Sequence, residues 1–481
     1  MTRLNSQLLK QLPNDIFKPH YDRNQIAGVV HLGIGAFHRA HQAVYFDALL
    51  NRGDVGWMIR GASLRSNNIA RTLNPQNGLF TVRSRDDAQD EVQIIGSVKE
   101  VIVGRADPAA LVARLASPET KLVTLTVTEK GYYMNIAAQT LLDTSSDIVR
   151  DIAHISAPVT PLGFLVAGLA TRKAAGLAPF TVLSCDNLPH NGRIARIAVV
   201  SLAERISPEL ARWIEKEVAF PSSMVDRIVP AVSVSDIDEL EVKTGWRDEA
   251  MVKTEPFSQW VIEDVFCNDR PKLESVGVQF TSDVSQWEAT KLRMLNGAHS
   301  ALAYRGGLVG HTYVSDAVAM PEFETFINQL WDEIEVTLPV IEGFSITAYR
   351  NELFNRFRNS TLQHRTQQIA TDGSQKIPQR LLAPLRERSN QGLQSPALIT
   401  AVACWIKWQR GVDDLGTHFS INDPLSEQLS EIVADSGIDA HALVRSITSL
   451  ESVFGKGFSD DKERLQALCQ MLAQLDLRGC C

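Results

Sequence analysis

Hydrophobic and polar residues follow two different patterns in the two parts of the chain. In the first 285 residues, short apolar runs typical of buried strands are separated by stretches with helical spacing. The predicted strands are residues 29–32, 57–62, 121–128 and 180–184. Helical spacing is clearest at residues 108–115 and 161–175. Strands that alternate with helices predict a parallel, doubly wound sheet.

From about residue 287 the apolar positions recur almost only at helical spacing. The predicted helices are residues 290–308, 321–337, 345–357, 397–409 and 462–475. The stretch 380–395 is interpreted as an exposed helix end and loop. A chain of 481 residues is long enough for two hydrophobic cores. We therefore expect an α/β Rossmann-type domain over residues 1–285 and a mostly α-helical domain over residues 286–481.

Composition and charge narrow the class of protein. A content of 44% hydrophobic and 22% charged residues is typical of a folded globular protein. A net charge of −8 argues against nucleic-acid binding, which needs a clustered cationic surface. The most apolar segment, residues 162–170, is too short to span a bilayer, and the N-terminal residues lack an apolar signal segment. We expect a cytoplasmic protein without a nucleic-acid or membrane partner.

The cysteines give no indication of a metal site. The chain has six cysteines, of which only Cys480 and Cys481 are close in sequence, and it contains no CxxC or HExxH motif. We expect no bound metal and interpret the thiols as buried or incidental. This weighs against a zinc-dependent alcohol dehydrogenase.

A glycine turn follows the first predicted strand. Gly33 and Gly35 allow the tight turn that brings backbone amides and a helix N-terminus close to a pyrophosphate. The third glycine of the usual dinucleotide motif is replaced by His38, which should keep the following helix farther from the strand. Many such turns bind nothing, so the turn alone leaves the cofactor question open.

The segment WEATKLRMLNGAHS contains a possible proton-transfer group. Lys291, Asn296 and His299 fall in one helical stretch, with Asn296 and His299 three residues apart and therefore neighbours. A lysine whose pKa is lowered by burial can accept a hydroxyl proton, and an amide can hold the developing oxyanion. A solvated lysine, a helix-capping asparagine and a hydrogen-bonded core histidine would explain this segment equally simply.

Two further segments place polar residues in apolar surroundings. Asp186 and Asn187 follow the strand at residues 180–184, at the edge where doubly wound sheets bind ligands. Asp226 and Arg227 lie within FPSSMVDRIVP. Helix capping or an ion pair would explain either segment, so only their combination is informative.

Six segments in this order resemble the mannitol dehydrogenase and fructuronate reductase family of polyol-specific long-chain dehydrogenases. They are GIGAFHRAHQ, TVTEKGYY, SCDNLPHNG, FPSSMVDRIVP, EPFSQWVIED and KLRMLNGAHS. The resemblance extends from about residue 25 to about residue 455. It implies a Rossmann-type N-terminal domain, a helical C-terminal domain, and metal-independent, NAD(P)-dependent catalysis in a cleft between them.

The resemblance also implies roles for individual residues. Lys291 matches the family's catalytic lysine, Asn187 and Asn296 match its oxyanion-binding amides, and His299 matches its substrate-orienting imidazole. The remaining matches are a substrate contact and two acidic positions near the lysine that assist proton exchange: Asp226, Glu288 and Glu129.

The region around residue 370 distinguishes members of the family. Lys376 matches a substrate-binding lysine of mannitol dehydrogenases, but their arginine eight residues earlier is replaced by Gln368. Arg365, Arg380 and Arg293 give a closer resemblance to fructuronate reductases. A guanidinium fork suits the carboxylate of a sugar acid. We therefore expect reduction of D-fructuronate to D-mannonate, with mannitol oxidation to fructose as the second reading and tagaturonate or another hexuronate still open.

The cofactor prediction depends on the loop after the second strand. The acid that usually binds the adenosine ribose hydroxyls is absent, and Arg65, Ser66 and Asn67 stand there instead. A 2′-phosphate would be tolerated and could pair with Arg65. The family's habit favours NAD(H), with NADP(H) open. The predicted cofactor-binding residues are Gly33, Gly35, Ala36, Phe37 and Arg65.

A rival reading from another class is a nicotinamide-binding sensor or scaffold that has lost catalysis. A protein that had lost catalysis should have substitutions at the catalytic positions first, but Lys291, Asn296 and His299 are all present. The expected partner is a small sugar acid or polyol. The sequence leaves the physiological direction open, and it leaves open whether the protein is a monomer or a small homo-oligomer.

Overall fold

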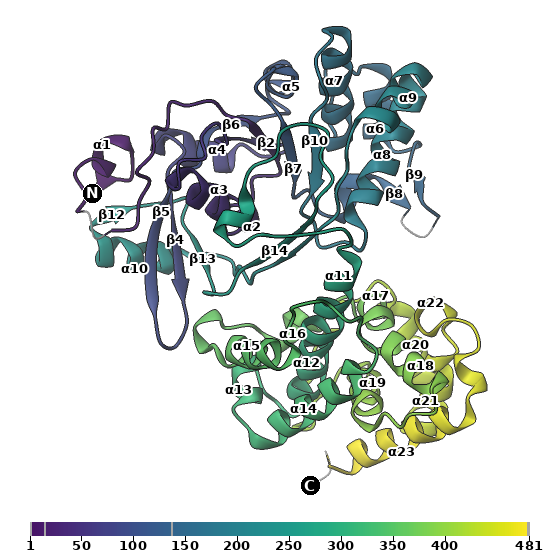
Figure 1. The fold of residues 1–481 in the computed structure, drawn as a ribbon. Coiled ribbons are helices and arrows are strands. Elements are labelled where there is room, and N and C mark those ends of the chain that lie inside the picture. The colour runs from purple at the N-terminus through teal and green to yellow at the C-terminus, as the bar shows by residue number, and fades with distance from the viewer. Residues whose placement is uncertain (1, 14–15, 136–137, 479–481) are drawn as a thin grey trace. The chain divides into compact units, whose positions relative to one another are not determined.

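The chain forms two compact units, Met1–Ser285 and Gln286–Cys481. The structure is a computed structural model that describes residues 2–13, 16–135 and 138–478 (Figure 1). The first unit contains a parallel sheet with helices, and the second is helical. The predicted fold class is therefore confirmed. None of the helices in the described ranges is long and apolar enough to cross a membrane.

A five-stranded parallel sheet organises the first unit. Its strand order is β10–β7–β2–β3–β6. The bounds are β2 (Val29–Leu32), β3 (Ile59–Ser63), β6 (Val98–Val103), β7 (Leu122–Leu125) and β10 (Thr181–Ser184). Because β2 lies between β3 and β7, the order of the strands reverses beside it. Doubly wound folds bind ligands outside the carboxyl ends of the strands at such a reversal.

The strands of the main sheet are largely apolar because both faces of the sheet are covered by other parts of the protein. All four residues of β2 are buried; Val29 belongs to one hydrophobic cluster and Val30 to another, as expected when successive side chains point to opposite faces. The helices of this unit are α1 (Ser6–Leu9), α2 (Ala36–Ala40), α3 (Gln42–Asn51), α4 (Asn68–Leu73), α5 (Pro108–Ala116), α6 (Ser146–Ala153), α7 (Pro161–Ala174), α8 (Asn191–Ile206), α9 (Pro208–Glu217) and α10 (Val234–Thr244).

Several strands outside the main sheet were not predicted. A hairpin of β4 (Phe80–Arg85) and β5 (Asp90–Ile95) is joined by β13 (Val252–Thr254). A second three-stranded sheet consists of β11 (Ser223–Asp226), β14 (Gln259–Glu263) and β15 (Gln279–Thr281). Two-residue pairs complete the set: β1 (Thr2–Arg3) with β12 (Trp246–Arg247), and β8 (Met134–Asn135) with β9 (Thr140–Leu141). The short 3₁₀ segments are η1 (Asn74–Gln76), η2 (Glu129–Tyr132) and η3 (Leu273–Val276).

Helices dominate the second unit, as predicted. They are α11 (Ser285–Lys291), α12 (Ala298–Leu308), α13 (Val314–Val318), α14 (Pro321–Glu335), α15 (Ile346–Arg358), α16 (Thr366–Ile369), α17 (Gly373–Ile377), α18 (Ala383–Asn390), α19 (Pro396–Trp408), α20 (Ser426–Ser436), α21 (Ala440–Thr448), α22 (Glu451–Phe454) and α23 (Lys462–Arg478). Two π-helical segments, η4 (Leu292–Gly297) and η6 (Pro378–Leu382), and the 3₁₀ segments η5 (Ser360–Leu362) and η7 (Phe458–Asp460) complete the unit. Among the described residues after β15, β-type pairing is limited to two isolated bridges.

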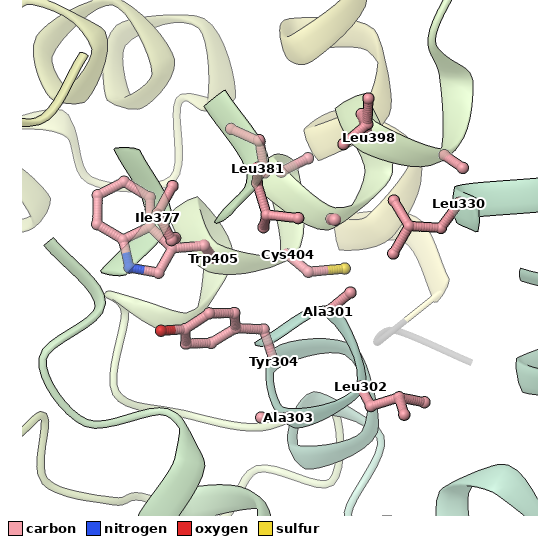
Figure 2. Close-up of a cluster of buried hydrophobic side chains, with 14 of the residues drawn as sticks. Ala301, Leu302, Ala303, Tyr304, Leu330, Ile377, Leu381, Leu398, Cys404 and Trp405 are labelled. Carbon is pink, nitrogen blue, oxygen red and sulfur yellow. The ribbon is translucent and has the colours of Figure 1, made fainter. Parts of the chain in front are cut away.

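The core of the second unit forms where α12 and α19 pack together (Figure 2). Ala301 and Ala303 are small enough for a close approach, and Tyr304 and Trp405 lie beside Ile377. A Cβ atom on Gly373 would lie 2.5 Å from the Trp405 indole nitrogen and from the Tyr304 hydroxyl oxygen. Glycine at this position therefore lets α17 pack directly on both aromatic side chains.

The interpretation of residues 380–395 as an exposed helix end and loop is wrong. Residues 378–390 are helical, and Leu381, Leu382 and Leu385 are buried. The polar pattern is misleading because Arg388 is itself buried. Its guanidinium donates hydrogen bonds to the Glu333 carbonyl oxygen at 3.0 Å, to Ser395 Oγ at 2.9 Å and to the Gln394 carbonyl oxygen.

Candidate functional site

A cavity of about 990 Å³ opens in the first unit at the carboxyl ends of β2, β3 and β7. These are the strands beside which the strand order reverses. The cavity is lined by glycines, hydroxyl side chains and arginines, among them Gly33, Gly35, Ser63, Arg65, Arg105 and Thr126. Its position and polar lining fit a dinucleotide.

The turn after β2 requires glycine. Gly33 has a φ of +98°, and an added Cβ atom would lie 2.1 Å from the Thr126 carbonyl oxygen. The Gly33 amide donates to the Ala62 carbonyl oxygen at 2.9 Å, and Thr126 Oγ1 donates to the Gly33 carbonyl oxygen at 2.8 Å. These hydrogen bonds hold the turn against the ends of β3 and β7. Gly33 and Gly35 form part of the cavity wall, where a phosphate group would approach them.

Three of the five predicted cofactor-binding residues line this cavity: Gly33, Gly35 and Arg65. Ala36 and Phe37 begin α2 but are not part of the lining. The Phe37 ring stacks on His41, with the centroids 5.1 Å apart. At His41 the predicted single helix divides into α2 and α3, because this residue has non-helical φ and ψ angles of −123° and −89°.

His38 occupies the position of the missing third glycine. Its ring is fully buried and lies parallel to the His31 ring of β2, with centroids 3.4 Å apart. The His31 ring nitrogens lie 2.8 Å from Thr124 Oγ1 and 2.9 Å from Thr126 Oγ1. Burial lowers the pKa of His31 to about 3 and the pKa of His38 well below its usual value. Both rings are therefore neutral, and they fill the space between helix and strand.

The sequence prediction missed several lining residues. Arg39, Arg105, Thr128 and Tyr133 contribute to the cavity wall. The Tyr133 hydroxyl donates to Asp147 Oδ2 at 2.7 Å. Partial burial and this carboxylate raise the pKa of Tyr133. Arg105 follows β6, and Thr128 and Tyr133 follow β7, so their places after strands could have identified them, whereas Arg39 lies on α2.

The other predicted site residues of the first unit lie at strand ends. Asn187 is exposed and follows β10, whereas Asp226 ends β11 and is buried. Ser223 of β11 donates from Oγ to the Ser184 carbonyl oxygen of β10 at 2.6 Å, which ties the two strands together. Glu129 is exposed and begins η2, just after β7, the direct neighbour of β10.

The predicted catalytic segment of the second unit contains an unexpected π-helix. Glu288 and Lys291 lie three residues apart on α11, Asn296 lies within η4, and His299 follows on α12. Five residues make about 1.4 turns of an α-helix, but in a π-helix the backbone hydrogen bond joins residues five apart. The π-helix therefore brings Lys291 and Asn296 toward the same side, which an α-helix would not do. Such segments are frequent at functional sites.

Carbonyl groups of this π-helix accept hydrogen bonds from outside it. The Trp331 indole nitrogen donates to the Met294 carbonyl oxygen at 2.9 Å. Arg380, from the second π-helix, donates from Nη1 to the Asn296 carbonyl oxygen at 3.4 Å and to Ser300 Oγ at 3.1 Å. A Cβ atom on Gly297 would lie 3.0 Å from the Arg380 carbonyl oxygen, so the two π-helices are in direct contact.

His299 lies in a buried, positively charged environment. Its side chain is 7% exposed, and its ring centroid is 4.6 Å from that of Phe357 and 5.1 Å from that of His364. Burial lowers the pKa of His299 well below its usual value, and the charges of Arg356 and Arg380 lower it further. The imidazole is therefore neutral and can donate and accept one hydrogen bond each.

Lys376 and Arg380 are neighbours one helical turn apart. Burial lowers the pKa of Arg380 to about 10. Burial also lowers the pKa of Lys376, and the charge of Arg380 adds to this effect. The Lys376 ammonium donates to the Thr371 carbonyl oxygen at 2.6 Å and lies 3.5 Å from that of Ile369. The two cations are thus hydrogen-bonded to neutral acceptors.

The structure corrects the prediction for Arg293. Its guanidinium forms a two-pronged ion pair with Glu387, with N–O distances of 2.6 and 2.7 Å, and donates to the Thr337 carbonyl oxygen at 2.6 Å. The fork that was expected to bind a substrate is therefore occupied by a carboxylate of the protein. Arg365 is exposed and lies over the Tyr313 ring, 5.7 Å from its centroid.

Two residues near His299 were not predicted. Arg356 of α15 is 4% exposed, and its charge lowers the pKa values of both His299 and His364. Burial brings the pKa of His364 to about 4. In the sequence Arg356 is one of several arginines at a helix end, so nothing distinguished it from a solvated residue.

The described residues were also compared with the expectations of no metal site and of buried or incidental thiols. Within the ranges that the structure describes, no group of three or more His, Cys, Asp or Glu side chains is arranged to hold a metal ion. Four cysteines there form no disulfide bond: Cys185, Cys267, Cys404 and Cys469.

Comparison with protein families identifies the chain. The model of the mannitol dehydrogenase Rossmann domain matches residues 27–275, and the model of the mannitol dehydrogenase C-terminal domain matches residues 283–476. The chain belongs to the mannitol dehydrogenase family. The resemblance stated from sequence motifs is therefore confirmed.

Named members of the mannitol dehydrogenase family are similar over nearly the whole chain. The D-mannonate oxidoreductase of Escherichia coli K12 is 39% identical over 472 residues, 96% of each chain. The uncharacterized oxidoreductase YeiQ of the same organism is 40% identical over 467 residues, 96% of this chain and 95% of that protein. The structure of Pseudomonas fluorescens mannitol 2-dehydrogenase in a ternary complex with NAD and D-mannitol has a TM-score of 0.85 and 36% identity, covering 99% of this chain and 98% of that one. The chain is thus an oxidoreductase of this family.

Proposed function

We propose that this protein is a metal-independent, NAD(P)-dependent secondary alcohol dehydrogenase that interconverts D-fructuronate and D-mannonate. The first unit would bind the dinucleotide, and residues of both units would contact the substrate. The D-mannonate oxidoreductase of Escherichia coli, 39% identical, supports this substrate class. The observation that carries the proposal is the environment of Arg380.

Arg380 suits a substrate with a carboxylate. In the described part of the chain its guanidinium is hydrogen-bonded only to the Asn296 carbonyl oxygen and Ser300 Oγ, both neutral, and it lies one turn from the cation of Lys376. The carboxylates of Asp372 and Asp423 raise the pKa of Lys376 but offset only part of the lowering by burial and by Arg380. Two partly buried like charges are costly unless an anion compensates them. The carboxylate of a sugar acid would do so, whereas a polyol has no charge.

The proposed roles follow from the chemistry of each side chain. The Gly33 turn would hold the pyrophosphate of the dinucleotide, whose nicotinamide would supply or accept the hydride. Lys291 would give the accompanying proton to the carbonyl oxygen in reduction and take it back in oxidation. The amides of Asn187 and Asn296 would donate hydrogen bonds to the developing oxyanion.

The remaining side chains would orient the substrate and exchange protons. His299 would bind a substrate hydroxyl as a neutral imidazole, and Asp226 would contact another hydroxyl. Glu288 and Glu129 would pass the proton between Lys291 and solvent. Arg365 stays a weaker candidate for the carboxylate, because it is exposed.

A second candidate function is the oxidation of D-mannitol to D-fructose. It is favoured by the 36% identity with the Pseudomonas fluorescens mannitol 2-dehydrogenase and by the presence of Lys376. Tagaturonate is a further alternative, because the same carboxylate clamp would accept another hexuronate.

The substrate assignment is tested by comparing fructuronate with fructose. We expect kcat/KM for the reduction of fructuronate to exceed that for fructose by about 100-fold, because the acid gains charge-assisted hydrogen bonds that the ketose lacks. Tagaturonate in the same assay separates recognition of the carboxylate from recognition of the hydroxyl configuration. Comparable kcat/KM for fructuronate and fructose would favour mannitol 2-dehydrogenase.

The cofactor assignment is tested with NADH and NADPH. We expect NADH to be preferred by less than about two orders of magnitude, because the loop after β3 carries Arg65, Ser66 and Asn68 in place of the usual ribose-binding acid. The acids that line the cavity, Asp147 and Glu249, lie outside this loop. Arg65→Ala should reduce kcat/KM with NADPH and change it little with NADH. A larger preference for either cofactor would show that residues outside this loop control the choice.

A further inference from the structure

Thr128 has a backbone conformation that threonine rarely adopts. Its φ is +65° and its ψ is 166°, a region accessible mainly to glycine. Thr126, Val127 and Thr128 follow β7 directly and line the dinucleotide cavity. A β-branched residue stays in this conformation only when its surroundings hold it there.

The group that holds this segment is the carboxylate of Asp186. The Thr128 amide donates to Oδ1 at 2.8 Å, and the Val127 amide donates to Oδ2 at 3.1 Å. The buried Tyr132 hydroxyl donates to Oδ2 at 2.7 Å. One carboxylate thus binds the two consecutive amides that lead into Thr128 and the side chain at the end of the following 3₁₀ turn.

Asp186 lies two residues after β10 and is itself held by the side chain of Asn191. The Asn191 side-chain amide donates to the Asp186 carbonyl oxygen at 2.9 Å and to the Ser223 carbonyl oxygen at 2.7 Å. The Ser223 amide donates back to Asn191 Oδ1 at 2.9 Å. The Asp186 carboxylate therefore has a defined position relative to β10 and β11.

Asp186 is adjacent to two predicted site residues, to one along the chain and to the other through its hydrogen bond to Thr128. Asn187 follows it in the chain, and Glu129 follows Thr128. We propose that Asp186 is a positioning residue that fixes the floor of the dinucleotide cavity and sets the places of Glu129 and Asn187 together. This inference rests on the proposed function, because the roles of Glu129, Asn187 and the cavity belong to it.

A role in stability alone does not explain this carboxylate. Burial raises the pKa of Asp186, although three donors oppose this rise. The ionised side chain is therefore less favourable here than in water, so folding gains little from its charge. What the carboxylate provides that an amide cannot is two oxygen acceptors for three donors.

The test is Asp186→Asn, assayed by NADH titration through protein fluorescence, by steady-state kinetics and by thermal unfolding. We expect the Kd for NADH to rise by about 10- to 100-fold, the usual effect of losing hydrogen bonds to a charged group, and kcat to fall as well. Adding Thr128→Gly should recover most of the NADH affinity, because glycine adopts the positive φ without support. If Asp186→Asn lowered NADH affinity only by destabilising the protein, Thr128→Gly would not restore that affinity, because glycine relieves only the backbone strain at this position.

Asp47→Asn is the matched control. Asp47 is also buried in the first unit and accepts hydrogen bonds from Tyr21 Oη at 2.6 Å and from the Gly96 amide at 2.7 Å, but it does not line the cavity. It should change the unfolding temperature without changing NADH affinity. If Asp186→Asn binds NADH as tightly as the wild type, or if Thr128→Gly restores nothing, the inference is wrong. Failure of the wild-type protein to bind NADH or NADPH would instead overturn the proposed function.

Discussion

Replacement of Lys291 by alanine is expected to lower kcat by about two to four orders of magnitude, the usual contribution of a positioned general acid or base. Affinity for the dinucleotide should stay nearly unchanged, because the proposed cofactor cavity is lined by residues of the first unit. Single-turnover kinetics and NADH titration of the same variant separate these two effects. Primary amines added to the solution should restore part of the lost rate by occupying the vacated space.

The pH dependence gives a second test of Lys291. Oxidation needs the neutral amine to accept the hydroxyl proton, and reduction needs the ammonium ion to donate one. The rate of oxidation should therefore rise with pH and the rate of reduction should fall, with both profiles reporting one ionisation apart from effects of bound ligands. In Lys291→Ala, the rise of the oxidation rate with pH and the fall of the reduction rate with pH should both disappear.

A lysine outside the proposed site serves as control. Lys253 is ion-paired with Asp236 at 2.8 Å in the first unit. Lys253→Ala should leave kcat and both pH profiles close to those of the wild type, since partly exposed pairs contribute little. If Lys291→Ala keeps near wild-type kcat and the same pH dependence, the lysine is structural. Proton transfer would then fall to Glu288 or His299.

Four of the five strands of the main sheet could be predicted because they are short and mostly buried, whereas β6 was missed because Lys99 and Glu100 interrupt its apolar residues. β2, β7 and β10 are short apolar runs that need no partner to be recognised. The hairpin of β4 and β5 was missed because its strands carry charged and polar residues, such as Arg83, Asp90 and Glu91, among the apolar ones. Its pairing depends on a partner strand rather than on a local apolar run.

The candidate site was only partly predictable, because some of its geometry depends on contacts that are distant in sequence. Lys291, Asn296 and His299 could be found from one helical stretch, but the π-helix that contains Asn296 has no sequence pattern that distinguishes it from an α-helix. Its carbonyl partners are Trp331 and Arg380. The role of Arg293 was misjudged for the same reason, because its partner Glu387 lies 94 residues later.

Arg380→Gln is expected to raise KM for fructuronate by about 10- to 100-fold, which corresponds to the loss of charge-assisted hydrogen bonds to a carboxylate. The change in kcat should be smaller, because a clamp remote from the reacting carbon acts in both the ground and transition states. KM for fructose should change little, since fructose has no carboxylate to lose. The measurement is steady-state reduction of both substrates by wild type and variant.

Arg293→Gln provides the matched control, because it removes a guanidinium that the structure pairs with Glu387 instead of a ligand. This variant should lower the unfolding temperature, since Glu387 loses its partner, while the ratio of kcat/KM for fructuronate to that for fructose stays at the wild-type value. The opposite result, a ratio that falls in Arg293→Gln and is kept in Arg380→Gln, would move the carboxylate clamp from Arg380 to Arg293. If neither variant changes the ratio, discrimination would depend on Lys376 or Arg365, and the same assay with Lys376→Met and Arg365→Gln would show which.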